Sequence, residues 1–301
     1  MAQRYDRDLE DIFAVQDEIT VTVVGAMQPE LEKHEQERAR LKKPDDLDAW
    51  DHCLKGNWHL YRSTKDELEQ AKIYFNRAIE ADRNFGPAYV GLAETFVHQW
   101  GVEPVDRTIE TNTVLLAEKA VQLDNKDSRA RQILGWAYLY IAKDTPAAII
   151  ELKTALELNP SSASAYAYLA FAQNSAGHAE IAIDNACEAI RLSPFDPLKG
   201  MFMTALAQAH LCLHQYEEAV KLGMDTIRQF PQSVRWIRVS NLVSALGHLE
   251  RLDEAAEYRN KLLGLRSDIS LKFIRDNHSL RYPAYQDHFI EGLRKAGVPE
   301  S

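Results

Sequence analysis

The sequence predicts an all-α protein built from similar pairs of helices that follow one another along the chain. The clearest observation is a phrase, Ala-x-x-Leu-x-Pro, that occurs at 155–160 and again 34 residues later at 189–194. A repeat of this length is typical of solenoids, in which each unit stacks on the next. The chain also has only 13 glycines and 11 prolines, which disfavours a β protein with many tight turns.

The segment 163–196 indicates how one unit is organised. Its first half has a stripe of residues spaced i, i+3, i+4 and i+7, and its second half has small residues on one helical face. The first set is Tyr166, Leu169, Ala170 and Gln173, and the second is Ala182, Ala186 and Ala189. Gly177 separates the two helices, and Pro194 separates this unit from the next. Because small side chains let helices approach closely, each unit is predicted to be an antiparallel helix pair.

These units resemble the tetratricopeptide repeat (TPR). That family favours a bulky residue, Leu-Gly and an aromatic residue on the first helix, then small, aromatic and small residues and a proline on the second. The unit at 163–196 fits, with Gln173 in place of the aromatic residue, and the unit before it has Leu134, Gly135 and Tyr138. We count six units between about 47 and 265, some of them looser. The resemblance implies a superhelix whose concave face is lined by the first helices and holds peptides or partner proteins.

The concave face supplies the candidate binding residues. In a TPR, certain positions of the first helix usually face the concavity. In this chain the residues at these positions are Gln132, Trp136, Tyr140, Phe171, Asn174, Gln208, Arg238 and Asn241. Trp136 and Phe171 occupy equivalent positions off the core stripe, so we expect exposed aromatic anchors for a partner. The alternative is that both rings pack on neighbouring helices.

The N-terminal segment, 1–46, is predicted to be a helical extension without the TPR pattern. Ile12, Val15, Ile19, Val23 and Met27 mark one apolar face of a helix. The first 50 residues carry 13 acidic and 7 basic residues. One interpretation is a cap whose apolar face packs on the first repeat. The other is a junction with another domain or a second subunit, including a homodimer through this helix.

A second resemblance covers nearly the whole chain. The run 4–19 resembles a linker in bacterial adenylate/guanylate cyclase-type proteins, where it follows a TolB-like domain and precedes TPRs. The ending 291–300 resembles the usual ending of the same proteins. This implies that the chain is either the scaffold part of a longer protein or a separate relative of it. No cyclase metal-binding motif is evident in the sequence.

The last segment, 266–301, contains two short helical patterns separated by Arg281-Tyr282-Pro283. We expect it to be a C-terminal cap that hides the apolar face of the last repeat, since the end of a solenoid otherwise exposes its core.

Composition excludes several classes of function. The formal net charge of −10 argues against nucleic acid and anionic membrane surfaces as partners. The sequence contains no run of 18 apolar residues, which a membrane span would need, and no evident secretory signal. A cytoplasmic location is therefore expected. Cys53, Cys187 and Cys212 are far apart and are expected to be small buried residues. His210 and His214 have helical metal-ligand spacing without a third ligand, so we expect no metal and no cofactor.

The sequence therefore predicts a bacterial, non-catalytic scaffold that binds a protein or peptide in a concave TPR groove. The alternative is a regulatory or oligomerising tail of a nucleotide cyclase or a similar signalling protein. No residue set suggests an enzyme active site.

Overall fold

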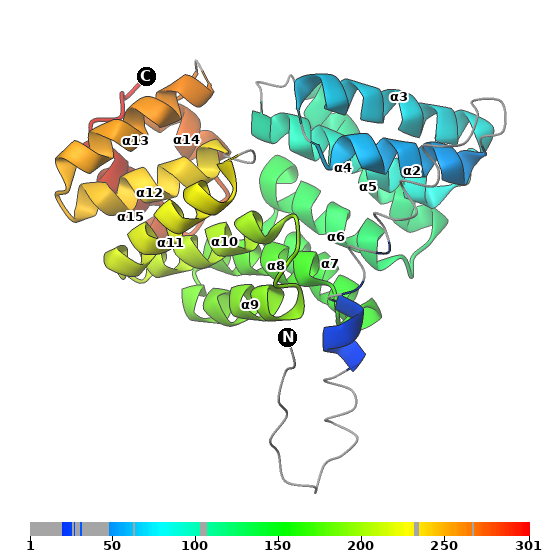
Figure 1. The fold of residues 1–301 in the computed structure, drawn as a ribbon, viewed down its shortest axis with the longest axis horizontal. Helices are drawn as coiled ribbons and strands as arrows, with labels where there is room; N and C mark the ends of the chain where they lie inside the picture. Colours follow the sequence, from blue (N-terminus) through cyan, green and yellow to red (C-terminus); the bar gives the residue numbers. More distant parts are fainter. Residues whose placement is uncertain are drawn as a thin grey trace, which may run out of the picture.

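The computed structural model describes residues 20–25, 27, 31, 48–62, 64–102, 107–231, 235–266 and 268–301, without the side chains of 100–102 and 107–110. Over these residues the secondary structure is helical, with no strand. The predicted all-α TPR superhelix is confirmed. In Figure 1 the units form an arc that runs from α2 through α7 and α9 to α13.

Six helix pairs make up this arc. They are α2 (Ala49–Leu60) with α3 (Lys65–Ala81), α4 (Gly86–Val102) with α5 (Arg107–Leu123), α6 (Ser128–Ala137) and its π-helical continuation η3 (Tyr138–Ala142) with α7 (Thr145–Leu158), α8 (Ala163–Ala176) with α9 (Ala179–Leu192), α10 (Lys199–Cys212) with α11 (Tyr216–Gln229), and α12 (Trp236–His248) with α13 (Leu252–Leu265). Two further helices follow, α14 (Leu271–Asn277) and α15 (Pro283–Lys295).

Local sequence signals set the ends of these helices. The hydroxyl of Ser162 accepts a hydrogen bond from the backbone N–H of Ala165 and so caps the start of α8. Gly177 ends the same helix with a left-handed φ of 88°, which a residue with a side chain rarely adopts. The break expected at Gly177 is confirmed.

Small residues bring the paired helices together. Ala148, Ala155, Ala182, Ala186 and Ala189 are all fully buried. At Gly135 of α6, a Cβ atom would lie 2.7 Å from Cγ of Leu152 in α7, so only glycine fits at this crossing. The repeated small positions in the sequence therefore correspond to the contacts between the two helices of a unit.

The C-terminal segment, defined here as residues 266–301, lies against helices of several units. Its helix α15 packs on α12 with backbones in contact, because Gly247 and Gly292 face each other. Its connection 278–282 reaches back to α8, where the N–H of Tyr282 donates to the carbonyl of Ser175 over 2.9 Å. The segment therefore covers the sixth unit and also crosses the fourth and fifth.

A second long-range contact joins the two arms of the arc. The guanidinium of Arg235, before α12, donates to the backbone carbonyl of His98 in α4 over 3.4 Å. Burial lowers the pKa of Arg235 to about 10. The second and sixth units thus meet, so the arc curls back on itself.

The described part of the N-terminal segment contacts the fourth unit, so the expectation that it packs on the first repeat is wrong for these residues. Arg191 of α9 donates to the hydroxyl of Thr22 over 2.9 Å. A Cβ at Gly25 would lie 3.1 Å from the carbonyl oxygen of Ser161, which shows how closely the backbones approach. The docked face thus consists of Thr22, Gly25 and the partly buried Val21, which packs on the cluster around Leu192, and not of the predicted apolar stripe.

The predicted stripe faces away from the repeats where it is described. Val23 and Met27 are 48% and 52% exposed, and Val24 and Leu31 are also exposed. Ile12, Val15 and Ile19 lie outside the described residues. The helix therefore leaves apolar side chains without a partner among the described residues.

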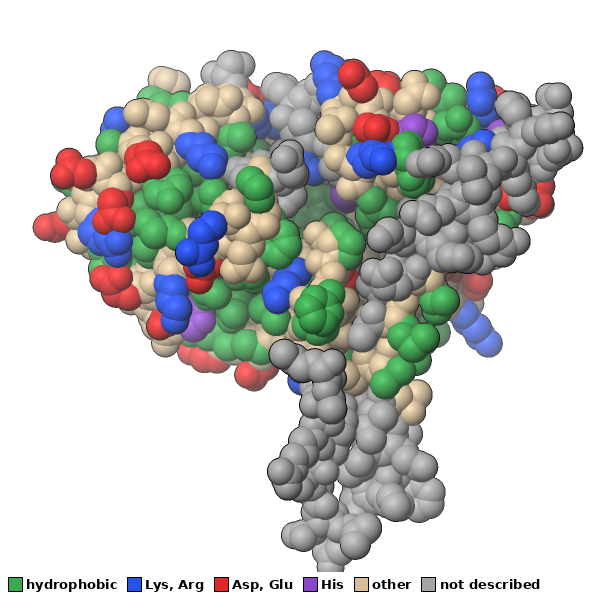
Figure 2. All heavy atoms as spheres, in the orientation of Figure 1, with side chains coloured by type: hydrophobic (Ala, Val, Ile, Leu, Met, Phe, Trp, Pro, Cys, Tyr) green, Lys and Arg blue, Asp and Glu red, His purple; other side chains and the backbone are tan. Residues whose placement is uncertain are grey.

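The surface carries mixed charge. On the face in Figure 2, acidic and basic side chains are interspersed with hydrophobic ones. Among the described helices, none combines the length and apolar character needed to cross a bilayer.

Candidate functional site

The eight predicted binding residues lie on the first helices of units three to six, and all of them are buried. The expectation that Trp136 and Phe171 are exposed is wrong. The other six predicted residues are buried as well, namely Gln132, Tyr140, Asn174, Gln208, Arg238 and Asn241. The physical reason is that neighbouring helices and the C-terminal segment cover these positions. We call the surface that they form, together with Ser175 and Thr204, the inner face.

The aromatic residues of the inner face pack on one another. The Trp136 ring stacks on Tyr140 with centroids 4.7 Å apart, and Tyr140 meets Phe171 edge-on at 6.4 Å. Trp136 is 6% exposed and Phe171 is 3% exposed. The alternative interpretation, in which both rings pack within the repeats, is the one that the structure supports.

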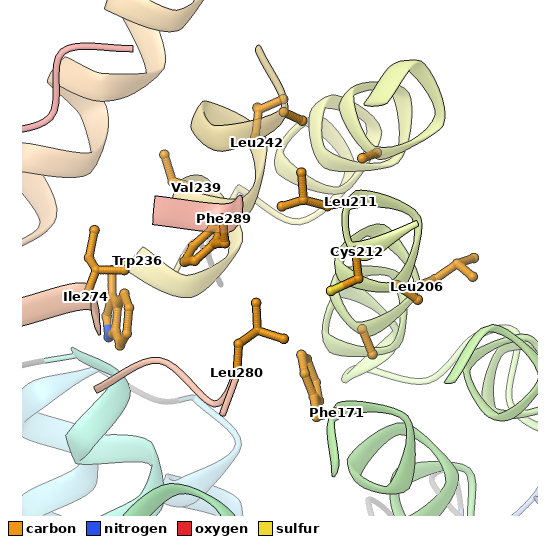
Figure 3. Close-up of a cluster of buried hydrophobic side chains, with 14 of the residues drawn as sticks. Phe171, Leu206, Leu211, Cys212, Trp236, Val239, Leu242, Ile274, Leu280 and Phe289 are labelled. Atoms are coloured by element: carbon orange, nitrogen blue, oxygen red, sulfur yellow. The ribbon is translucent and has the colours of Figure 1, made fainter. Parts of the chain in front are cut away.

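Leu280 of the C-terminal segment lies beside the Phe171 ring (Figure 3). Figure 3 shows it between Phe171 of α8 and Phe289 of α15, in the same buried cluster as Trp236 and Cys212. The Leu280 side chain is 0% exposed. An apolar side chain from the C-terminal segment thus occupies the place expected for a partner's anchor.

Polar residues of the inner face bind the backbone and side chains of the same segment. The Ser175 hydroxyl donates to the carbonyl of Ser279 over 2.6 Å and contacts the Thr145 hydroxyl at 2.9 Å. Gln208 Nε2 lies 3.3 Å from His278 Nε2. Asn174 supports this group, because its amide donates to the side-chain oxygen of Gln208 over 3.3 Å. Sequence reasoning missed Ser175 and Thr145, which have no TPR signature.

The remaining predicted residues have separate surroundings. Gln132 accepts a hydrogen bond from the Ser162 hydroxyl, and Arg238 Nε donates to the Thr204 hydroxyl over 3.0 Å. Burial and the adjacent Arg235 charge lower the pKa of Arg238 to about 10. Both amide atoms of Asn241 are buried without a hydrogen-bond partner among the described residues.

The Tyr140 hydroxyl and the neighbouring Cys212 thiol are held in their neutral forms. Burial raises the pKa of the Tyr140 hydroxyl, and Ser279 and Arg281 oppose this rise. Burial also raises the pKa of the Cys212 thiol. Neither shift favours the deprotonated form that a nucleophile or general base requires. Within the described residues, no group of three or more His, Cys, Asp or Glu side chains is arranged to hold a metal ion.

Comparison with known proteins gives a fold and one partial relative. No family model matches. A protein of Rhizobium meliloti (strain 1021) called "Putative adenylate cyclase 3" is 30% identical over 146 residues, which are 47% of this chain and 24% of that protein. The chain thus matches about a quarter of that relative's length.

Two solved structures share the architecture at low identity. The Cut9–Hcn1 complex of the APC/C matches with a TM-score of 0.61 and 15% identity over 91% of this chain and 48% of that chain. Human IFIT1, solved as a dimer with m7Gppp-AAAA, matches with a TM-score of 0.62 and 14% identity over 84% and 60% of the two chains. At these identities the likeness concerns the fold, and the capped RNA is a ligand of IFIT1.

Proposed function

We propose that this chain is a non-catalytic protein-interaction scaffold whose inner face holds a protein segment. One observation supports this most directly: the inner face already holds an extended segment, residues 278–282, through contacts of the kind used for peptides. Ser175 binds its backbone at two points, the carbonyl of Ser279 and the N–H of Tyr282. Leu280 supplies an apolar anchor. Backbone hydrogen bonds with side-chain pockets are a common mode of peptide recognition.

The neutral state of the Tyr140 hydroxyl on this face favours binding over chemistry. A peptide site needs shape, apolar anchors and hydrogen bonds, all of which the inner face has. A partner segment would compete with the chain's own residues 278–282. The two occupants would share the same chemistry, namely an extended backbone with one large aliphatic side chain.

The variant Leu280→Asp tests this proposal. A carboxylate at this fully buried position lacks a hydrogen-bond partner, so the variant's own segment should leave the inner face. A fluorescent peptide with the sequence of residues 271–301 should then bind the variant, measured by anisotropy, and should not bind the unmodified chain.

A peptide that carries the same Leu280→Asp change is the matched control and should bind neither protein. If the variant keeps its helical circular dichroism and still fails to bind the unmodified peptide, the inner face is not a segment-binding surface.

A second function, as a regulatory or oligomerising tail of a nucleotide cyclase or similar protein, is favoured by a different observation. The described N-terminal residues Val23, Val24, Met27 and Leu31 are exposed, while Thr22 and Gly25 dock on the repeats. The relative that is called a cyclase is much longer than the region matched here. An apolar stripe in this position suits contact with an upstream domain or with a second copy of the chain.

The pair of changes Val23→Asp and Met27→Asp tests self-association. Placing two charges on the exposed stripe should convert a dimer into a monomer by light scattering, with a change of stability within about 0.5 kcal/mol because both side chains are half-exposed. The control pair Ile73→Asp and Leu115→Asp alters exposed apolar residues on α3 and α5 and should leave the oligomeric state as it is. An unmodified chain that is monomeric at all concentrations would rule out the homodimer.

A further inference from the structure

Three histidine rings form a column where the C-terminal segment meets the repeats. His288 of α15 stacks on His214, which follows α10, with centroids 4.0 Å apart. On its other side it stacks on His248 of α12 at 3.9 Å. The planes of each pair are within 12° of parallel. One ring of the C-terminal segment is thus held between two rings of the fifth and sixth units.

Hydrogen bonds fix the column around a neutral His288. The Tyr216 hydroxyl, from α11, lies 2.9 Å from His288 Nε2, and His248 Nε2 donates to the His288 backbone carbonyl over 2.9 Å. The other charged groups near His288 are Lys295 and Glu291, both on α15. Burial, then His248, His214 and Lys295, lower the pKa of His288 to about 4, and Glu291 opposes them.

A second histidine of the C-terminal segment is also docked in its neutral form. The Nδ1 atom of His278 accepts from the backbone N–H of Leu280 over 3.3 Å, and Nε2 faces Gln208 of α10. A proton on Nδ1 would remove the first of these hydrogen bonds. Its ring lies 6.1 Å from Trp236 of α12 and 4.4 Å from Phe289 of α15. Burial, followed by the charge of Arg281, lowers the pKa of His278 to about 3.

We propose that the C-terminal segment docks on the inner face only when His278 and His288 are unprotonated, so that acidification releases it and uncovers the inner face. A released segment would expose both rings to water, where a histidine takes up a proton near pH 6.5. A group that binds its proton more weakly in the docked state shifts the equilibrium toward release as the pH falls. The docked state therefore weakens from about pH 6.5 downward.

The segment is a better candidate for local opening than the repeats themselves. Its docking buries polar atoms without hydrogen-bond partners among the described residues, on Arg281 of the segment and on Asn174 and Asn241 of the inner face. Each such atom opposes docking, because it gives up water without a replacement hydrogen bond. The contacts within a unit, by contrast, are formed mainly by fully buried alanines and leucines.

The three cysteines provide a direct readout. Cys212 is buried close to Tyr285 of α15, whose hydroxyl has its pKa raised by burial and by this thiol. Cys53 is buried in the first unit, far from the segment in the chain, and reports general unfolding. Cys187 is exposed, contrary to the expectation that all three cysteines are buried, and is replaced by serine for the experiment.

The experiment is labelling of the Cys187→Ser chain with dithiodipyridine at pH 7 and pH 5, with each rate divided by that of glutathione at the same pH. The relative rate for Cys212 should rise by about tenfold or more at pH 5, while Cys53 stays protected. His288→Phe, which keeps a stacking ring without a titratable group, should reduce this rise. His210→Gln, a change outside the column, should not.

Three results would overturn the proposal. They are equal relative rates for Cys212 at both pH values, joint labelling of Cys53 and Cys212, and an unchanged rise in a folded His288→Phe variant. The regulatory meaning of the release rests on the proposed segment-binding function. The labelling itself needs no partner and no added peptide, so failure of the peptide experiment and failure of this one are distinguishable.

Discussion

Replacing Gly247 with alanine is expected to separate α15 from α12. The added Cβ would overlap the backbone carbonyl of Gly292 and would lie 3.2 Å from the backbone nitrogen of Ala296. Backbone atoms cannot rotate away as a side chain can, so one helix must move. We expect a loss of about 3 kcal/mol in the free energy of unfolding, measured by urea denaturation, because overpacking a tight contact has this order of cost.

Gly264→Ala is the matched control for this change. Gly264 lies in α13, and a Cβ there would meet nothing within 4 Å. Because glycine costs a helix interior conformational entropy, this variant should be more stable by about 0.5–1 kcal/mol. If Gly247→Ala lowered the free energy of unfolding no more than Gly264→Ala does, α15 would not be packed closely on α12.

Phe75→Ala is expected to destabilise the first two units strongly. The Phe75 ring is fully buried and lies against Gly56 of α2 and Gly91 of α4, where a Cβ atom would overlap it. Removing a buried phenylalanine ring costs about 3–5 kcal/mol through lost burial and an unfilled cavity. Thermal and urea unfolding of the variant should show this loss.

A double-mutant cycle identifies the contact responsible. Gly91→Ala alone should be destabilising because its methyl group meets the Phe75 ring. In the Phe75→Ala background the same methyl group enters vacated space, so its cost should fall by more than about 1 kcal/mol. Additive effects of the two changes would show that the ring does not pack against Gly91.

The helix pairs could be predicted from the sequence because their determinants are local and recur. Ala155 and Ala189 are equivalent in the repeat, and both are fully buried at the crossing of two helices. Gly177 adopts the left-handed conformation that ends a helix. Each of these features depends on residues fewer than about 40 positions apart, which is the range that a repeat pattern reports.

The state of the inner face could not be predicted in this way. A residue's position along the first helix of its repeat correctly selects residues that share one surface, such as Tyr140, Phe171 and Gln208. Whether these residues are exposed depends on which other parts of the chain cover them. The covering residues come from far away in the chain: Ser175 and Ser279 are 104 positions apart. No periodic pattern links two such positions, so the sequence predicted a cap at the end of the array and not a segment across it.

The N-terminal helix illustrates the same limit. Its apolar stripe suggested the face that docks, yet Thr22 and Gly25 dock instead. A hydroxyl within reach of Arg191 and a glycine that permits close backbone approach decide the orientation. Both features are contacts with particular residues of the fourth unit, and helical periodicity carries no information about such contacts.

In the structure, the chain's own C-terminal segment occupies the inner face of the repeats. Hydrogen exchange of the Tyr282 backbone amide at pH 7 tests it most directly, because this N–H donates across the interface to the Ser175 carbonyl. We expect this amide to exchange about 1,000-fold or more slowly than in an unstructured peptide. Exchange of Tyr282 at the unstructured rate, with α8 itself protected, would contradict it.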